Sequence, residues 1–238
     1  MYNKIIKDLK KVADNNRSKH DVMFFKTGSG QYGEGDKFRG VSGKHQNPIA
    51  KKYYKEASLE DCSKLLDSKW HDERQTALRI LRLKFEKSKD EKVRKQIYDL
   101  YLKKRKGINN WDLVDVSAPS IVGGYLLRYS EGERRILYKF ARSKDLWEKR
   151  IAIIATYGFI RASEFENTLE ISKILLYDDH DLIHKAVGWM LREVGNRDRV
   201  VEEKFLKGYY KEMPRTMLRY AIEKFPEGLR QRYLKGKV

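Results

Sequence analysis

Residues 74–81 read RQTALRIL, and this pattern of polar residues followed by small and apolar ones returns at 148–154, EKRIAII, and at 183–189, IHKAVGW. Aligned on the pattern, the equivalent positions are separated by 37, 37 and 35 residues: Thr76, Leu113, Arg150 and Lys185. A period of this length is typical of helix pairs that stack side by side, each burying its apolar face against its neighbours. The repeat therefore predicts an all-α fold, a curved α-solenoid.

Helical periodicity extends over most of the chain. Apolar residues recur at helical spacing from Ile5 to Val12 and from Val93 to Tyr101, and alternating strand patterns are nearly absent. Helix starts are predicted where a capping residue or a first-turn proline precedes an apolar pattern: Asn47-Pro48, Ser58 with Asp61, Asn109-Asn110, Ser163 with Glu166, and Met213-Pro214. We expect a single domain over residues 1–238.

The charge points to a polyanionic partner. Lys and Arg number 52 against 34 Asp and Glu, which gives a net charge of +18. Such a field attracts phosphate-rich partners, and nucleic acid is the first candidate. A membrane is set aside because the longest apolar runs fall far short of the roughly 20 residues that a span requires. The N-terminus has no apolar signal-peptide region, so we expect a cytoplasmic protein.

Metal and disulfide chemistry find little support. The single cysteine, Cys62, excludes an intramolecular disulfide and is expected to be a buried structural thiol. His180 and His184 have the helical spacing that can suit zinc, but the general base of a zinc protease motif and cysteine ligands are lacking. Residues 179–181 are better interpreted as a helix cap, and no metal site is predicted.

Residues 26–40, KTGSGQYGEGDKFRG, interrupt the helical pattern with five glycines, a density that excludes a stable helix. The segment lacks the Gly-Lys-Ser/Thr ending of a nucleotide-binding loop and does not follow an apolar strand. Two interpretations stay open. The segment is either a loop or short hairpin that contacts the DNA backbone, or a surface connector.

Residues 110–115, NWDLVD, place an indole, Trp111, one helical turn from a carboxylate, Asp115. Asp112 lies in the first turn, where a carboxylate is expected to complement the helix dipole. Asp115 lies deeper in the helix, where a buried carboxylate needs a partner or a function. An inter-helix ion pair with Arg150 and a functional role both remain open at this point.

Three segments resemble the signature segments of the AlkD-type DNA alkylation repair family, the HEAT-like-repeat DNA glycosylases: 110–115 (NWDLVD), 146–152 (LWEKRIA) and 185–193 (KAVGWMLRE). Residues 24–28 and 33–38 are similar to members with a Gly-rich insertion, and the resemblance covers nearly the whole chain. One departure is that residues 43–47 intervene where the family commonly shows a proline-led helix start, here at Pro48. The superfamily also contains paralogues without glycosylase activity.

The resemblance implies a monofunctional glycosylase of base excision repair. It would remove cationic N3- and N7-alkylated purines, such as 3-methyladenine and 7-methylguanine, from duplex DNA, without the base flipping usual for enzymes that act on bases. Asp115 would be the catalytic carboxylate, Trp111 and Trp189 would stack against the sugar and backbone of the lesion nucleotide, and Arg150 would hold a phosphate. Lys185 and Trp147 are further candidates for DNA binding.

The same resemblance implies no cofactor and no metal, and we expect a monomer whose partner is duplex DNA containing alkylated purines. One alternative belongs to another class of function: a non-catalytic HEAT-repeat binder of damaged or branched DNA. For such a binder the net charge of +18 is sufficient and Asp115 is structural.

Overall fold

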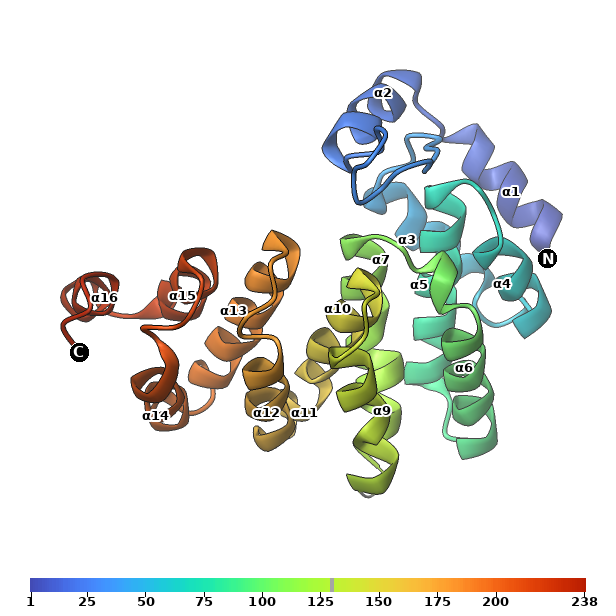
Figure 1. The fold of residues 1–238 in the computed structure, drawn as a ribbon. Helices are drawn as coiled ribbons and strands as arrows, with labels where there is room; N and C mark the ends of the chain where they lie inside the picture. Colours follow the sequence, from blue (N-terminus) through green and yellow to red (C-terminus); the bar gives the residue numbers. More distant parts are fainter. Residues whose placement is uncertain (129–130) are drawn as a thin grey trace. The chain divides into compact units, whose positions relative to one another are not determined.

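The computed structural model describes residues 1–128 and 131–238 and is helical over most of this length (Figure 1). The chain divides into two compact units, Met1–Tyr125 and Leu126–Val238. Within the described residues no strand is present, and the only β-type pairing is an isolated bridge between Lys37 and Trp70. The predicted all-α class is confirmed, whereas the expectation of a single domain stays a prediction.

The helices of the first unit are α1 (Tyr2–Lys11), α2 (Asn15–Phe24), α3 (Gly43–Tyr53), α4 (Leu59–Leu66), α5 (His71–Lys87), α6 (Glu91–Lys103), η1 (Arg105–Gly107), α7 (Trp111–Ala118) and η2 (Pro119–Gly123). A short helix, α8 (Gly124–Leu126), lies at the boundary. The helices of the second unit are α9 (Glu131–Ala141), α10 (Leu146–Ala155), α11 (Tyr157–Arg161), α12 (Glu166–Ile174), α13 (Asp181–Gly195), α14 (Arg199–Tyr209), α15 (Arg215–Ala221), η3 (Ile222–Lys224) and α16 (Glu227–Leu234).

Helix α5 is the centre of the first unit. It packs against α3, α4 and α7, and its Leu78, Ile80 and Leu81 are fully buried. The start of α4 is a capping box, as the sequence predicts: the Ser58 hydroxyl accepts the Asp61 N–H, and the Asp61 carboxylate accepts the Ser58 N–H. This order places α5 between the N-terminal helices and α7.

Helix α13 is the centre of the second unit, where it packs against α10, α12, α14 and α15. Figure 1 shows these helices following one another from yellow to red. Gly188 is required where α13 meets α15, since a Cβ there would lie 2.4 Å from the carbonyl oxygen of Met217. The contact fixes the part of α13 that carries the adjacent Trp189.

The repeat predicted from the sequence corresponds to real helices. Its four aligned positions lie near the starts of α5, α7, α10 and α13. In each unit these helices pack against their sequence neighbours, as the helix pairs of an α-solenoid do.

Two predicted helix starts are wrong. Helix α3 begins at Gly43 and contains Pro48, so the residues that depart from the family pattern form its first turns. Pro48 lacks an N–H and leaves the Lys44 carbonyl without its helical partner, a cost that the packing of α3 on α5 offsets. Ser163 does not cap α12: it lies at φ 62, and the helix starts at Glu166 after Phe165.

Two smaller expectations can be compared with the fold. Cys62 is fully buried in α4, as predicted, and burial raises the pKa of its thiol to about 12. Among the described residues, no helix combines the length and the apolar character needed to cross a bilayer.

Candidate functional site

Helix α7 carries Trp111 and Asp115. Asn110 caps it in extended backbone, φ −152 and ψ 157, and its side-chain oxygen accepts the Trp111 N–H at 2.9 Å. Because the helix begins at Trp111, Asp115 follows one turn later on the same face. Both side chains are half-buried and retain exposed surface. The first unit therefore brings these two predicted site residues together.

An aromatic cluster supports the Trp111 indole. Phe25 stacks on it with ring centroids 5.4 Å apart at an interplanar angle of 22°, and Phe24 meets it edge-on at 5.9 Å. Phe38 stacks on Phe25 at 5.0 Å, and the His71 ring lies 4.6 Å from Phe38. Aromatic pairs of this kind contribute about 0.5–1.5 kcal/mol each beyond the area they bury. The orientation of the indole is therefore fixed by the protein itself.

The Gly-rich segment, residues 26–40, provides much of this support. Phe25 directly precedes it and Phe38 lies within it. As its glycine content predicts, the segment forms turns rather than a helix. Gly33 allows it to approach α7, since a Cβ there would lie 2.3 Å from the Phe25 carbonyl oxygen and 3.2 Å from Asn110 Nδ2. The segment thus packs against the start of α7, and its contact with DNA stays a prediction.

A buried charged network joins the Gly-rich segment, α5 and α7. His71 is bonded through Nδ1 to Asp36 at 3.0 Å and through Nε2 to Asp112 at 2.9 Å, and Arg74 donates to Asp36 at 2.6 Å. Burial disfavours the imidazolium, but the carboxylates of Asp112 and Asp36 outweigh it and raise the pKa of His71 to about 9. At neutral pH His71 is therefore a cation that donates from both ring nitrogens.

Asp112 has a larger role than the dipole complement predicted from its place in the first turn. Its Oδ2 accepts from Gln75 Nε2 at 2.5 Å as well as from His71, and its side chain is 13% exposed. These partners lie 37 and 41 residues away in the sequence, so local pattern could not reveal them. Asp112 fastens α7 to α5.

Two arginines that the sequence reasoning did not single out lie on α5 beside α7. Arg82 donates to the Val116 carbonyl oxygen at 3.4 Å, and Arg79 donates to the Asn47 side chain at 2.7 Å. Burial and the neighbouring charge of Arg82 lower the pKa of Arg79. The signal available in the sequence was their spacing of three residues, with Arg79 inside the repeated segment 74–81 and Arg82 directly after it. They add positive charge beside the helix that carries Asp115.

In the second unit, α10 and α13 bring Arg150, Lys185 and Trp189 together. Arg150 is 5% exposed and donates from Nη1 to the Leu182 carbonyl oxygen at 2.6 Å. Leu182, Lys185 and Trp189 are three and four residues apart and so share one face of α13. Lys185 also forms an ion pair with Asp181 at 2.7 Å.

The two tryptophans of the second unit are both half-buried. Trp189 Nε1 donates to Glu193 Oε1 at 3.0 Å, and the Tyr157 ring lies 6.2 Å from the indole at an angle of 45°. Trp147 is the second residue of α10, where its N–H donates to the capping Asp145 at 2.7 Å. The indole of Trp189 is therefore oriented by both a hydrogen bond and a ring contact.

The histidine pair of α13 follows the capping interpretation. His180 precedes the helix and its Nδ1 accepts the Leu182 N–H at 3.1 Å, while His184 bonds the Asp178 carbonyl oxygen. In the part of the chain that the structure describes, no group of three or more His, Cys, Asp or Glu side chains could hold a metal ion.

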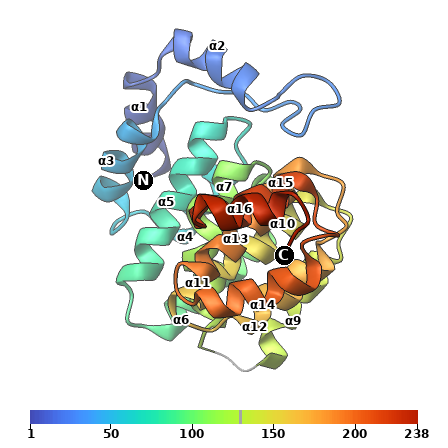
Figure 2. The ribbon, with the colours of Figure 1, turned by 90° about the vertical axis from the view of Figure 1, so that its left-hand side faces the viewer.

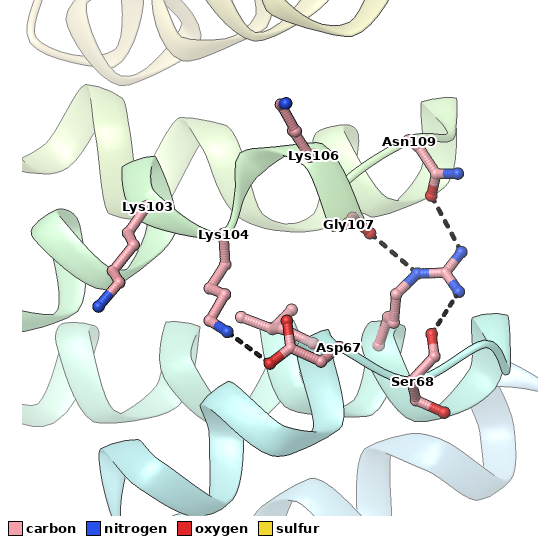
Figure 3. A pocket seen from close by; sticks show the side chains of 9 residues that line it. Asp67, Ser68, Lys103, Lys104, Lys106, Gly107 and Asn109 are labelled. Carbon is pink, nitrogen blue, oxygen red and sulfur yellow. Dashed lines mark hydrogen bonds and ion pairs between the residues drawn. The ribbon is translucent and has the colours of Figure 1, made fainter.

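A polar cavity of about 460 Å³ lies in the first unit next to the turn that leads into α7 (Figure 3). Arg74 forms one side by donating to the carbonyl oxygens of Ser68 and Gly107 and to Asn109 Oδ1. On another side of the cavity, Lys104 forms an ion pair with Asp67 at 2.5 Å. Further lining residues are Leu66, Lys103 and Lys106. Trp111 and Asp115 do not line this cavity, so it does not form a base pocket at the candidate site.

Comparison with known proteins gives two findings. The family model described as DNA alkylation repair enzyme matches residues 5–225. Among solved structures, a predicted DNA alkylation repair enzyme from Enterococcus faecalis superimposes with a TM-score of 0.69, covering 90% of this chain and 97% of that one at 14% identity. At this identity the similarity concerns the fold alone. No curated protein matches the sequence.

Proposed function

The chain belongs to the family of DNA alkylation repair enzymes, and we propose that it is a monofunctional DNA glycosylase that releases cationic N3- and N7-alkylated purines from duplex DNA. 3-Methyladenine and 7-methylguanine are the proposed substrates. The observation that carries the proposal is the pairing on α7 of a carboxylate, Asp115, with an indole, Trp111, that Phe25 holds in place. A protein of net charge +18 that only bound phosphate would have no use for a carboxylate there.

The proposed chemistry follows from the charge of the lesion. An alkylated purine is already a cation, so the bond from C1′ to the base nitrogen can break with its electron pair leaving on the base, and no proton is needed. The deoxyribose becomes oxocarbenium-like, and the Asp115 carboxylate stabilises this positive charge. Water then adds to C1′ and passes its proton to Asp115 and on to solvent. The products are the free base and an abasic site.

The other candidate residues act through binding. Trp111 and Trp189 would present indole faces to the sugar, where each cation–π contact is worth about 0.5–2 kcal/mol depending on desolvation. Arg150, whose guanidinium donates to the Leu182 carbonyl oxygen, would hold a phosphate. Lys185 and Trp147 would contact the DNA backbone. The protein would act as a monomer on chromosomal DNA in the cytoplasm.

Replacement of the carboxylate tests the proposal. Asp115→Asn should reduce release of 7-methylguanine from duplex DNA about 100-fold or more, because one electrostatic stabiliser of the transition state is lost. Binding of undamaged DNA should not weaken, since the change removes a negative charge. Single-turnover base release and fluorescence anisotropy measure the two effects. Asp99→Asn, which alters an exposed carboxylate on α6, is the matched control.

Two results would contradict the proposal in different ways. Equal base release by Asp115→Asn and the unaltered protein would remove Asp115 from the mechanism. Tight DNA binding without release of any base by the unaltered protein would favour the alternative, a non-catalytic binder of damaged or branched DNA.

A further inference from the structure

Helix α2 exposes its apolar side chains and buries an acidic one. Val22, Met23 and Phe24 are 40%, 71% and 51% exposed, whereas Asp21 is 3% exposed. Among the described residues five large hydrophobic side chains are exposed, and three of them are this tripeptide. A surface helix usually shows the opposite pattern: its apolar side chains are buried against the core of the protein and its charged side chains are exposed. A contiguous exposed apolar patch therefore indicates a surface for a partner.

Several polar contacts hold α2 in place beside its apolar tip, residues Val22, Met23 and Phe24. Asp14 caps the helix by accepting the N–H groups of two first-turn residues, Asn16 and Arg17, at 2.8 and 3.0 Å. Ser18 Oγ donates to the Phe38 carbonyl oxygen at 2.8 Å, and the buried Asp21 lies 3.3 Å from Arg17 Nε. Phe24 adds edge-on ring contacts with Phe25 and Trp111, yet it remains 51% exposed, and Met23 is 71% exposed. Most of the surface of both side chains is therefore available to a partner.

The exposed face of α2 combines cations with apolar side chains. Lys19 and Met23 are four residues apart, as are His20 and Phe24, so both pairs lie on one face. The His20 and Phe24 rings stack at 5.6 Å and 19°, and exposed Lys26 follows the helix. Lysines beside a protruding Met and Phe suit DNA, where cations contact phosphates and apolar side chains contact bases.

The tip also lies beside the candidate site, because Phe24 meets the Trp111 indole edge-on at 5.9 Å. Figure 2 shows α2 at the periphery of the first unit, followed by the loop of the Gly-rich segment. We propose that Met23 and Phe24 form an apolar wedge that contacts DNA next to the lesion nucleotide and partly unstacks the neighbouring base step. The position next to a lesion rests on the proposed function, whereas the contact with duplex DNA does not.

Fluorescence of 2-aminopurine tests the wedge, because this base brightens when it is unstacked. We use duplexes with 2-aminopurine beside either guanine or 7-methylguanine. The unaltered protein should increase the emission, and the double variant Met23→Ala/Phe24→Ala should abolish most of this increase. The double variant should also bind about tenfold more weakly, as expected for the loss of a stacking contact with a base.

Matched variants separate the wedge from charge and from folding. The double variant should keep the salt dependence of binding, whereas Lys19→Ala should lower the slope of log K against log salt by about 1. Val200→Ala changes another exposed apolar residue, 76% exposed on α14, and should leave emission and affinity unchanged. Sedimentation should be the same for all these proteins. Thermal stability should fall slightly in the double variant alone, because it loses the ring contacts of Phe24 with Phe25 and Trp111.

The outcomes distinguish the wedge from the proposed function. Unaltered emission and affinity in the double variant overturn the wedge. Loss of thermal stability, or a change in sedimentation, with unchanged DNA binding also overturns it, since the tip then packs on the chain itself or on a second copy. If the unaltered protein unstacks both duplexes but releases no base, the glycosylase proposal fails and the wedge stands.

Discussion

Two carboxylates on α7, three residues apart, occupy different surroundings. Asp112 accepts hydrogen bonds from His71 and Gln75 and fastens α7 to α5. Asp115 lies one turn from Trp111, on the face proposed to meet DNA. Helical spacing predicts the pairing of Asp115 with Trp111, because it depends only on residues within one turn. It could not predict the role of Asp112, whose partners come from another helix.

The His71 network predicts a loss of stability in alkaline solution. The pKa of His71 in the folded protein, about 9, lies above its ordinary value of 6.5. Its stabilisation is therefore fully present below about pH 6.5 and is lost as the pH rises through 9. A pKa shift of this size corresponds to about 3 kcal/mol in the free energy of unfolding. Urea unfolding at pH 6 and pH 9.5 should show the difference, and His71→Gln should abolish most of it.

Glu202 provides a control at a separate position in the second unit. Burial raises the pKa of its carboxyl to about 8 from 4.5, so its contribution is present below pH 4.5 and is lost as the pH rises through 8. When the free energy of unfolding is plotted against pH, Glu202→Gln should flatten the curve between about pH 4.5 and 8 and leave the decrease near pH 9 unchanged. A profile that His71→Gln leaves unchanged between pH 6.5 and 9 would contradict the proposed charge of His71.

At the scale of the helix, predictions from the sequence succeed where the signal is local. The capping box at Ser58 and the cap at Asn110 involve side chains and N–H groups within a few residues of one another. The predicted start at Pro48 is wrong because α3 already begins at Gly43 and packs on α5. The predicted start at Ser163 is wrong because this residue ends α11 instead: its N–H donates to the Ile160 carbonyl oxygen and the Glu164 N–H to that of Phe159, as in a Schellman motif. The aromatic support of Trp111 could not be predicted, since it depends on how the Gly-rich segment folds back onto α7.

The packing of α10 on α13 makes a specific prediction for Arg150. Its buried guanidinium bonds the Leu182 carbonyl oxygen, so Arg150→Ala should cost about 1.5–3 kcal/mol of stability whether or not Arg150 binds DNA. Only the salt dependence of DNA binding can then reveal a phosphate contact. If the contact exists, Arg150→Ala should also lower the salt slope by about 1, measured by anisotropy titrations at several salt concentrations.

Arg150→Lys is the control for this experiment. It keeps the positive charge but lacks the planar fork of the guanidinium, so it should retain the salt slope while losing part of the stability. An unchanged slope in Arg150→Ala would show that the residue is structural and would leave Lys185 as the candidate phosphate contact on that face of α13.

At the scale of the whole molecule, the repeat and the charge carried the most information. Helical periodicity predicted the all-α class, and a period near 37 residues predicted stacked helix pairs because each pair needs its neighbours to bury its apolar face. The net charge of +18 predicted a polyanionic partner, and it agrees with membership of a DNA repair family. Neither property identifies the reaction. In the proposed mechanism the reaction depends on the few side chains around Asp115 and on the chemistry of the lesion.

The reaction proposed for the molecule predicts that excision follows the charge of the lesion. A neutral base must be protonated as it leaves, which requires a general acid. His71 is a protonated side chain near Trp111, but it is buried and both of its ring nitrogens bond carboxylates, so it cannot deliver a proton to a base. The protein should therefore release 7-methylguanine and 3-methyladenine and leave uracil and hypoxanthine essentially untouched. Side-by-side release assays in duplex DNA compare the four bases, and rapid excision of uracil would mean that a general acid operates at the site.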